Sequence, residues 1–487
     1  MDRSNATTHT RTRGARLLVL TLLGTLLAGM ALSLASCGEK TAQVPTPAGT
    51  LRPTFTSIPA QAATLEPSAT LPVPTVAATA TLTPMVTETV PTDEPSPTGA
   101  PVATQTPMVV TATPAPATAT PQASPTPGLR TKMRSPDYGM QAFLWWRPEV
   151  AQRDLEEIHN AGFRWVKQDF AWREIEGAGK GRFDWSIADR VVAQVQSVGK
   201  LRLIVRLDSD PTWASGQTYP NAQNVIMSPP KDLQDFADFC YAVASRYEGQ
   251  IGAYQIWNEP NLSREWGGKA PDPAGYVAML KAGYQAIKRA DPDALVISAG
   301  MAPTTRNDKV AMPDTQFLTR MYAAGARPYF DYLGAHGAGF KAPPEMDPAD
   351  VSTDPNYYNR GDANCPGPAC RIYCFRHVED LHQISIDNGD PYKRVVVLEF
   401  GWTMDERSNS PYRWHAVTED QQAEYFVHAY QYARDHWQPW IAVMSLIYMP
   451  DNNWTQDDEQ FWWSIAAPGY PQFIPYKAYR DLAAMPK

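Results

Sequence analysis

The chain has 487 residues and a formal net charge of −8, and no block of Lys or Arg interrupts its C-terminal part. Nucleic-acid binding requires clustered Lys and Arg side chains that neutralise phosphates, so the sequence disfavours a nucleic-acid partner. All 15 tryptophans lie between Trp145 and Trp463. A weakly acidic, tryptophan-rich region suits a neutral, polar ligand with flat faces.

The N-terminus has the pattern of an export signal. Three arginines precede an apolar run over residues 17–34, and the letters LASC close this run at Cys37. The pattern resembles the bacterial lipobox, which implies that Cys37 is lipidated. An uncleaved membrane anchor is the alternative, because the apolar run approaches spanning length. We expect residues 1–37 to be a lipoprotein signal peptide that leaves the protein anchored to the outer face of a bacterial membrane.

Residues 38–130 form a segment of low complexity. Pro, Thr, Ala, Ser and Val dominate it, and it holds 18 of the 45 prolines but only one aromatic residue, Phe55. Such a segment cannot bury enough apolar surface to offset the entropy lost on ordering. We predict a disordered or polyproline-like stalk, followed by a single folded domain over residues 131–487.

Strand-like and helix-like patterns alternate along this domain. Strands are predicted over 139–143, 164–170, 201–207, 252–259, 295–300, 330–336, 394–400 and 441–449, and the helices that follow them over 148–162, 184–199, 232–249, 273–290, 314–324, 375–388, 419–435 and 476–484. Alternation of this kind predicts βαβ units and a parallel sheet. Eight such units closing on themselves give the α/β fold of the (β/α)8 TIM barrel, whose active site lies at the C-terminal strand ends. A doubly wound open sheet is the alternative, but no glycine-rich phosphate-binding fingerprint follows the first strand.

Four cysteines follow the signal segment. Cys240 lies in an apolar helical stretch and is predicted to be a buried free thiol. Among Cys365, Cys370 and Cys374 we expect one local disulfide and one spare thiol, because an exported chain permits disulfides. Zinc bound by these three cysteines and His377 is the alternative, although the spacing lacks a CxxC pair. We expect neither a metal site nor a cofactor.

Two glutamates stand at predicted strand ends. Glu259 occurs in the sequence YQIWNEPN, where Pro260 cannot donate to a sheet ladder and should end the fourth strand at about Glu259. Glu399 ends the seventh strand. In a barrel both ends face one mouth, so the two carboxylates can face each other. Cleavage of a glycosidic bond needs such a pair, whereas a surface salt bridge is the alternative for either glutamate alone.

The sequences WNEPN and VLEFGW resemble the strand-four and strand-seven motifs of clan A retaining glycoside hydrolases. The resemblance covers residues 138–482 and is nearest to family 39 β-xylosidases and family 5 endoglucanases and mannanases. It implies that Glu259 is the general acid/base, that Glu399 is the nucleophile, and that Asn258 binds the 2-hydroxyl of the sugar. The expected carboxyl separation is about 5–5.5 Å.

The resemblance also implies further substrate-binding residues. Lys167 takes the place of an Arg that supports the nucleophile in those families. His336 ends strand six where the family often has a His, and Trp454 could form the hydrophobic floor under the sugar. Trp402 and Asp208, near the ends of strands seven and three, are further candidates. Core packing is the alternative for either tryptophan.

These features predict a retaining glycosidase that cleaves β-linked glycosides or polysaccharides and is tethered to the cell surface as a monomer. Its partners would be an oligo- or polysaccharide substrate and, through lipidated Cys37, the membrane. A barrel without activity that binds glycans at the cell surface is the alternative, and a purely structural surface lipoprotein is a third reading.

Overall fold

The computed structural model describes residues 133–217 and 227–487, which all belong to one compact unit of the chain. The predicted signal peptide, Cys37 and the stalk lie outside the described residues. Within these two ranges no helix combines the length and the apolar character needed to cross a bilayer.

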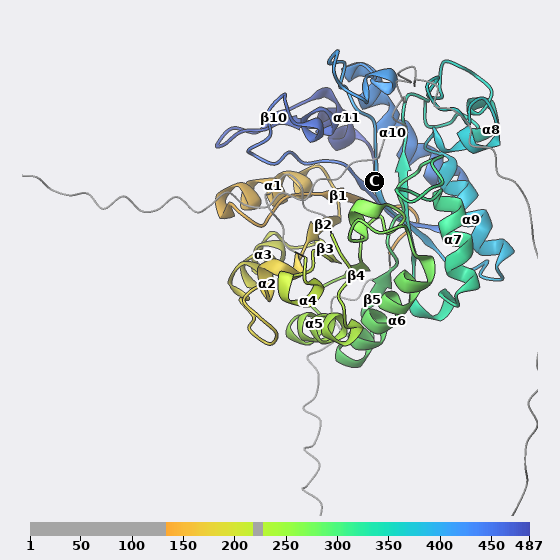
Figure 1. The fold of residues 1–487 in the computed structure, drawn as a ribbon. Helices are drawn as coiled ribbons and strands as arrows, with labels where there is room; N and C mark the ends of the chain where they lie inside the picture. Colours follow the sequence, from red (N-terminus) through yellow and green to blue (C-terminus); the bar gives the residue numbers. More distant parts are fainter. Residues whose placement is uncertain (1–132, 218–226) are drawn as a thin grey trace, which may run out of the picture. The chain divides into compact units, whose positions relative to one another are not determined.

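Eight parallel strands form the centre of the domain (Figure 1). They are β1 (Asp137–Gln141), β2 (Trp165–Asp169), β3 (Arg202–Leu207), β4 (Ala253–Ile256), β5 (Leu295–Ile297), β6 (Leu333–Ala338), β7 (Val395–Gly401) and β8 (Ile441–Leu446). Their order is β5-β4-β3-β2-β1-β8-β7-β6, and a single parallel bridge between Ile297 and Tyr332 joins the two edges. The predicted TIM barrel is therefore confirmed, with each predicted strand present.

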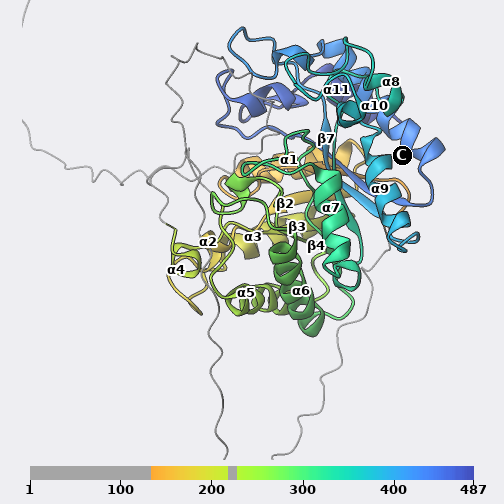
Figure 2. The same ribbon diagram turned by 45° about the vertical axis from the view of Figure 1, so that its right-hand side comes forward.

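Helices surround the strands in both views (Figures 1 and 2). Those predicted from the sequence are α1 (Pro148–Asn160), α3 (Ser186–Val198), α5 (Leu233–Arg246), α6 (Pro273–Ala290), α7 (Asp314–Ala323), α9 (His377–Asp387), α10 (Glu419–His436) and α11 (Lys477–Ala484). Side chains that accept from backbone N–H groups start several of them: Asp232 caps α5, Asp272 caps α6, and Thr418 forms a capping box with Gln421 at α10.

The sequence did not predict the short elements in the loops. These are α2 (Trp172–Ile175), α4 (Thr212–Ser215), α8 (Pro348–Val351), the 3₁₀ helices η1 (Ser263–Glu265), η2 (Arg327–Tyr329), η3 (Pro368–Ile372), η4 (Arg413–His415) and η5 (Glu459–Trp463), and the hairpin of β9 (Ala466–Ala467) and β10 (Ile474–Pro475). Most of them follow the C-terminal ends of the strands. They therefore shape the mouth of the barrel, where loops vary with function.

The barrel interior changes from apolar to polar along the strands. Trp165, Ile204 and Ala253 belong to an inner apolar cluster, while the neighbouring positions pack against the helices. Because side chains alternate along a strand, the next inner positions toward the mouth are Lys167 and Arg206, and both are buried. The interior thus presents charged groups directly below the mouth.

Candidate active site

Glu259 stands just beyond the end of β4. The strand ends at Ile256, three residues earlier than predicted, because the backbone turns into the left-handed region at Trp257 (φ 68°) and Glu259 (φ 40°). The N–H of Glu259 donates to the carbonyl of Gly300 at 3.0 Å, which ties this turn to the segment after β5. Left-handed backbone at residues with side chains is uncommon and collects at functional sites.

Glu399 lies within β7, and a bulge turns its side chain into the barrel. Val397 and Phe400 pack against the helices, and Leu398 faces the interior. The register against β6 shifts between Ala335 and His336, so that Glu399 lies opposite His336. Leu398 and Glu399 consequently both face inward, although strict alternation would put Glu399 among the helices. Bulges often re-aim a side chain in this way beside active sites.

Lys167 of β2 holds Glu399 from inside the barrel. Its Nζ lies 2.8 Å from Oε1 of Glu399 and donates also to the carbonyl of Leu398 at 3.3 Å. Burial by itself would raise the pKa of Glu399, but the positive charge of Lys167, assisted by His336 and Arg206, outweighs burial and lowers it. The carboxyl group of Glu399 is therefore kept ionised.

The two carboxylates and His336 converge. Nδ1 of His336 lies 3.1 Å from Oε1 of Glu259 and 3.9 Å from Oε2 of Glu399. One oxygen of each carboxylate and a ring nitrogen of His336 all lie within 4.8 Å of one another. His336 rests against Gly300, where a Cβ atom would overlap the imidazole ring. A side chain at position 300 would therefore displace His336 from between the carboxylates.

Arg264, the second cation of the site, contacts Glu259 from the loop that contains η1. Nη2 of Arg264, in η1, donates to Oε2 of Glu259 at 3.0 Å, and its Nε donates to Oε1 of Glu265 at 3.2 Å. Burial raises the pKa of Glu265 to about 8, although the charge of Arg264 opposes this. Glu259 therefore receives one hydrogen bond from a loop and a second contact from the barrel wall.

A cavity opens in front of the two carboxylates. Residues at the ends of β4, β6, β7 and β8, in the segment after β5 and in η5 line it: Glu259, Pro303, His336, Ala338, Glu399, Phe400, Ile447, Tyr448, Glu459 and Trp463. Burial raises the pKa of Glu459 to about 8, against hydrogen bonds from Tyr412 and Trp463. The cavity thus combines two aromatic rings with a third carboxyl group that is largely protonated at neutral pH.

Part of the barrel resembles a known family of glycoside hydrolases. Residues 124–339 match the model of the cellulase family, glycosyl hydrolase family 5, and this range contains Glu259. The matched range spans β1 to β6 and less than half of the chain. The match ends before Glu399, so the position of that residue in the site is known from the geometry alone.

Solved structures share the fold of this barrel. A family 39 glycoside hydrolase from the gut symbiont Bacteroides cellulosilyticus WH2 has 18% sequence identity and a TM-score of 0.51, covering 72% of this chain and 63% of that chain. A glucosidase from Croceicoccus marinus has 12% identity and a TM-score of 0.50, covering 72% and 67%. The chain therefore spans less than two thirds of the family 39 protein. No curated protein sequence matches it significantly.

The prediction that Trp402 lines the substrate cleft is wrong. Trp402 is fully buried, donates from Nε1 to the carbonyl of Ala342, and packs against Phe375, Tyr425 and Phe426. Its position after the β7 bulge explains the error, because the bulge turns Glu399 inward and leaves Trp402 among the helices. The alternative of core packing holds for this tryptophan.

Trp454 lies behind the cavity wall. Its ring packs edge-on against Phe143, with centroids 4.7 Å apart, and against Tyr448, with centroids 5.4 Å apart. Tyr448 and Trp463 face the cavity in its place. Only the loop geometry after β8 distinguishes these aromatic residues, since all three follow the same strand.

Asp208 and Asn258 are buried beside the cavity and do not line it. Oδ2 of Asp208 forms an ion pair with Nε of Arg206 at 2.7 Å, so the predicted subsite role is replaced by a buried ion pair below the mouth. Asp169 pairs with the same arginine at 3.2 Å. Oδ1 of Asn258 lies 3.4 Å from Nε2 of Gln255, next to the turn that carries Glu259.

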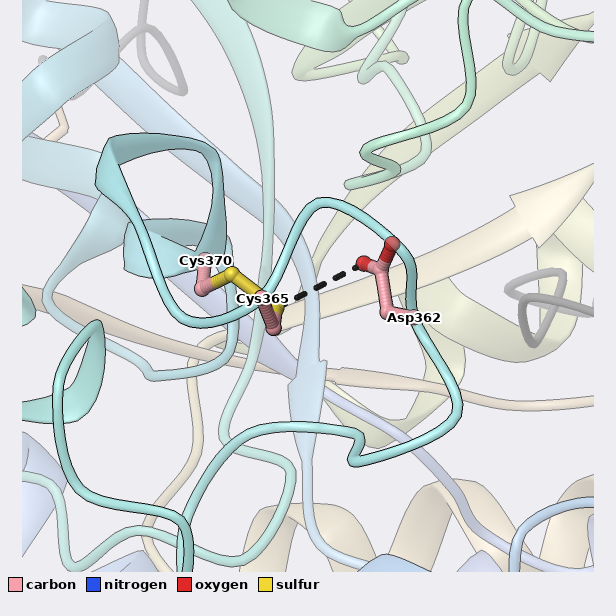
Figure 3. A group of neighbouring side chains, drawn as sticks. All are labelled: Asp362, Cys365 and Cys370. Carbon is pink, nitrogen blue, oxygen red and sulfur yellow. Dashed lines mark hydrogen bonds between the residues drawn. A yellow bond between two sulfur atoms is a disulfide. The ribbon is translucent and has the colours of Figure 1, made fainter.

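The insertion after β6 contains the predicted disulfide. Cys365 is bonded to Cys370, while Cys374 and Cys240 are buried free thiols, as the sequence indicated. Figure 3 shows Asp362 beside this bond, with its Oδ2 3.7 Å from Sγ of Cys365. A disulfide sulfur carries no hydrogen, so this approach is a contact without a donated proton.

The zinc alternative is wrong. Two of its sulfur atoms are bonded to each other, and the fourth predicted ligand, His377, contacts Asp314 at 2.8 Å and Asp380 at 3.0 Å instead. A disulfide sulfur is not a thiolate and does not ligate Zn²⁺ as one.

Proposed function

We propose that the domain is a retaining glycoside hydrolase that cleaves β-linked glycosides or polysaccharides, with Glu259 as the general acid/base and Glu399 as the nucleophile. The approach of the two carboxylates, with oxygens within 4.8 Å, carries this proposal. Retaining enzymes place their carboxyl groups about 5–5.5 Å apart, whereas inverting enzymes need about 6.5–9.5 Å to admit a water molecule. The close approach of the two carboxylates at this mouth favours the shorter spacing of a retaining enzyme.

The contacts suit two different roles. Glu399 is ionised, and Lys167 occupies its Oε1, which leaves Oε2 on the side of His336 and Glu259 to attack the anomeric carbon. Glu259 would donate a proton to the leaving oxygen in the first step. In the second step it would take a proton from the water that hydrolyses the glycosyl-enzyme.

Sugar binding would use the remaining cavity wall. Tyr448 and Trp463 offer ring faces to the sugar, and Glu459, largely protonated, can both donate to and accept from a hydroxyl group. Asn258, adjacent to Glu259 in sequence, remains our candidate for the contact with the 2-hydroxyl.

A panel of aryl β-glycosides and β-linked polysaccharides, with products resolved by size, tests the activity. We expect the wild-type protein to hydrolyse at least one member of the panel. Glu399→Gln is the matched control, because it keeps the shape of the side chain and removes the nucleophile. Glycan binding by the wild type without hydrolysis would overturn the proposal and favour the inactive, glycan-binding barrel.

We also propose that the protein is exported as a monomer and tethered through lipidated Cys37, on the sequence pattern alone. Stable anchoring requires more than one acyl chain, which bacterial lipidation supplies. Cys37→Ser should therefore release the protein from the membrane fraction while the hydrolytic activity persists. If Cys37→Ser stays with the membrane at wild-type levels after a salt wash, the apolar segment is an uncleaved anchor.

A further inference from the structure

One arginine ties together two loops beside the cavity. Arg407 belongs to the β7 loop (residues 402–418), and its Nη1 donates to two backbone carbonyls of the β8 loop (residues 447–465). These carbonyls belong to Gln456 and Asp457, and each distance is 2.8 Å. Both of these residues are exposed, so burial does little to fix this part of the β8 loop. Its path is set by the hydrogen bonds to the guanidinium group instead.

Asp405 holds the same guanidinium group from the other side. Its Oδ1 accepts from Nε of Arg407 at 2.8 Å and its Oδ2 accepts from Nη2 at 2.7 Å, the two-pronged geometry of an arginine–carboxylate pair. The side chain of Asp405 is buried, whereas that of Arg407 is 25% exposed. Burial alone would raise the pKa of Asp405, but hydrogen bonds from Arg407 and Ser410 outweigh burial and lower that pKa. The buried carboxylate is therefore ionised and fixes the direction of the guanidinium group.

The β8 loop folds back on itself next to Arg407. Nε1 of Trp462 donates at 3.0 Å to the carbonyl of Gln456, which also accepts from Arg407. The guanidinium carbon lies over the ring of Trp462, 5.7 Å from its centroid, in a cation–π contact. The N–H of Met404, in the β7 loop, donates to the carbonyl of Trp462 at 2.9 Å. Both ends of the stretch 456–462 are thus attached to the β7 loop.

This stretch determines where two of the cavity-lining residues lie. Glu459 is inside it, and Trp463 follows it directly. Trp463 is buried, and its ring centroid lies 6.1 Å from that of His415 in the β7 loop. Tyr412 of the same loop donates a hydrogen bond to Glu459. The positions of both cavity-lining residues therefore depend on how the β8 loop is held against the β7 loop.

We propose that Arg407 is a positioning residue for sugar binding, which fastens the β8 loop to the β7 loop so that Trp463 and Glu459 face the sugar. The inference rests on the proposed function and deepens it, because it assigns contacts with the sugar ring and with one of its hydroxyl groups to this wall. Arg407 itself lies outside the residues that line the cavity. It therefore acts through Trp463 and Glu459 and leaves the reacting atoms of Glu259 and Glu399 in place.

A comparison of KM with kcat separates this role from a catalytic one. Arg407→Gln should raise KM for the aryl β-glycoside that the wild type hydrolyses fastest by about tenfold, the size of one lost hydrogen bond or ring contact. It should leave kcat within about threefold of the wild type, because a contact made equally in the ground state and the transition state affects KM alone. A fall in kcat with an unchanged KM would overturn the inference.

A binding measurement without turnover accompanies the kinetics, because KM equals a dissociation constant only when chemistry is slow. Calorimetry with the same aryl β-glycoside gives its dissociation constant for Glu399→Gln, which cannot form the glycosyl-enzyme. Adding Arg407→Gln to this variant should raise the dissociation constant about as much as it raises KM. Equal affinity of the single and the double variant would contradict the proposed role of Arg407.

Arg407→Lys tests whether the charge alone is sufficient. A lysine keeps the positive charge but lacks the planar fork, so it cannot donate to both oxygens of Asp405 and to both carbonyls of the β8 loop at once. The variant should therefore show most of the rise in KM seen in Arg407→Gln. A wild-type KM in Arg407→Lys would show that the tie between the loops is not needed and overturn the inference.

Arg306→Gln is the matched control. Arg306 lies in the loop after β5, and its Nε donates to Asp308 in that same loop at 2.8 Å. The variant thus breaks an arginine–aspartate pair with the same spacing of two residues, but a pair within one loop. Its KM and kcat should equal those of the wild type. An equal rise of KM in Arg306→Gln and Arg407→Gln would show a general effect of lost charge and overturn the inference.

Trp462→Phe tests the same tie if Arg407→Gln fails to fold. It removes the donor to the carbonyl of Gln456 and keeps an aromatic ring beneath the guanidinium group, so KM should rise by about threefold with kcat unchanged. A wild-type KM in this variant would then overturn the inference. An active wild type with an unchanged KM in Arg407→Gln overturns only the role of Arg407. A wild type that hydrolyses no β-glycoside overturns the proposed function and, with it, this role.

Discussion

The ends of β4 and β7 hold their glutamates in different ways. Glu399 lies inside a continuous strand, and its partner Lys167 is a buried residue of the barrel interior. Glu259 lies beyond its strand in left-handed backbone, and its partner Arg264 is a partly exposed loop residue. A nucleophile must stay ionised, whereas an acid/base must gain and lose a proton in each cycle. The cation beside Glu399 accordingly lies in the barrel interior, and the cation beside Glu259 lies in a loop.

Removal of the nucleophile should have the largest effect. Glu399→Gln should lower kcat on the order of 10⁵-fold, the size of loss that follows when the nucleophile of a catalytic unit is removed. Steady-state kinetics on the best aryl β-glycoside of the panel measures it. If Glu399→Gln kept more than a tenth of the wild-type activity, the role assigned to the β7 end would be wrong.

Removal of the acid/base should have an effect that depends on the leaving group. Glu259→Gln should slow substrates with poor leaving groups by about 10²–10⁴-fold, because general acid catalysis contributes that much. Activated aryl glycosides need little protonation and should lose much less in the first step. A series of aryl glycosides of graded leaving-group pKa measures the difference, and an equal loss across the series would contradict the role of Glu259.

Replacement of Lys167, the cation beside Glu399, should affect the acidic limb of the pH profile of kcat/KM. Lys167→Met removes the charge that lowers the pKa of Glu399, so that pKa should rise and the acidic limb of kcat/KM should move to higher pH. We expect a loss of about 10²-fold at neutral pH, comparable to the loss of one preorganised donor. Lys167→Arg is the control that keeps the charge. If only the basic limb shifted, Lys167 would act on the acid/base and not on the nucleophile, which would contradict the roles assigned to the ends of β4 and β7.

A charged cluster between α7 and α9, outside the residues that line the cavity, should affect stability only. His377 joins α9 to Asp314 of α7, and although burial would lower its pKa, Asp314 and Asp380 raise it to about 10. The raised pKa stabilises the fold fully below the unfolded value of 6.5, and this contribution is lost as the pH rises toward 10. His377→Gln should cost about 3–5 kcal/mol of unfolding free energy. Denaturant unfolding at several pH values should show the deficit shrinking above pH 6.5, with the pH profile of kcat/KM unchanged.

The sequence predicted the fold well because local patterns carry it. Strand and helix periodicities, together with caps such as Asp232 and Thr418, fix where the long elements begin and end. The sequence placed the end of β4 too late. The prediction relied on Pro260, but the backbone already turns left-handed at Trp257, and no residue type predicts that turn. The short loop helices lack periodicity and were missed for the same reason.

The site was only partly predictable. Glu259, Glu399, His336 and Lys167 converge because strand ends of a barrel meet at one mouth, a property of topology. Arg264, Glu459 and Trp463 were missed, since their contacts depend on how loops fold back over the mouth. Arg264 had one available signal, because it follows Glu259 by five residues. Trp402 was misjudged because a bulge cannot be read from alternation.

The stereochemistry of the first-formed product tests the central claim most directly. Proton NMR of wild-type hydrolysis of an aryl β-glycoside resolves the α and β anomers before they interconvert. Because oxygens of Glu259 and Glu399 lie within 4.8 Å of each other, which favours the short carboxyl spacing of retaining enzymes, we predict that the β anomer forms first and the α anomer appears later by mutarotation. An α anomer formed first would show inversion and contradict the assignment of Glu399 as the nucleophile.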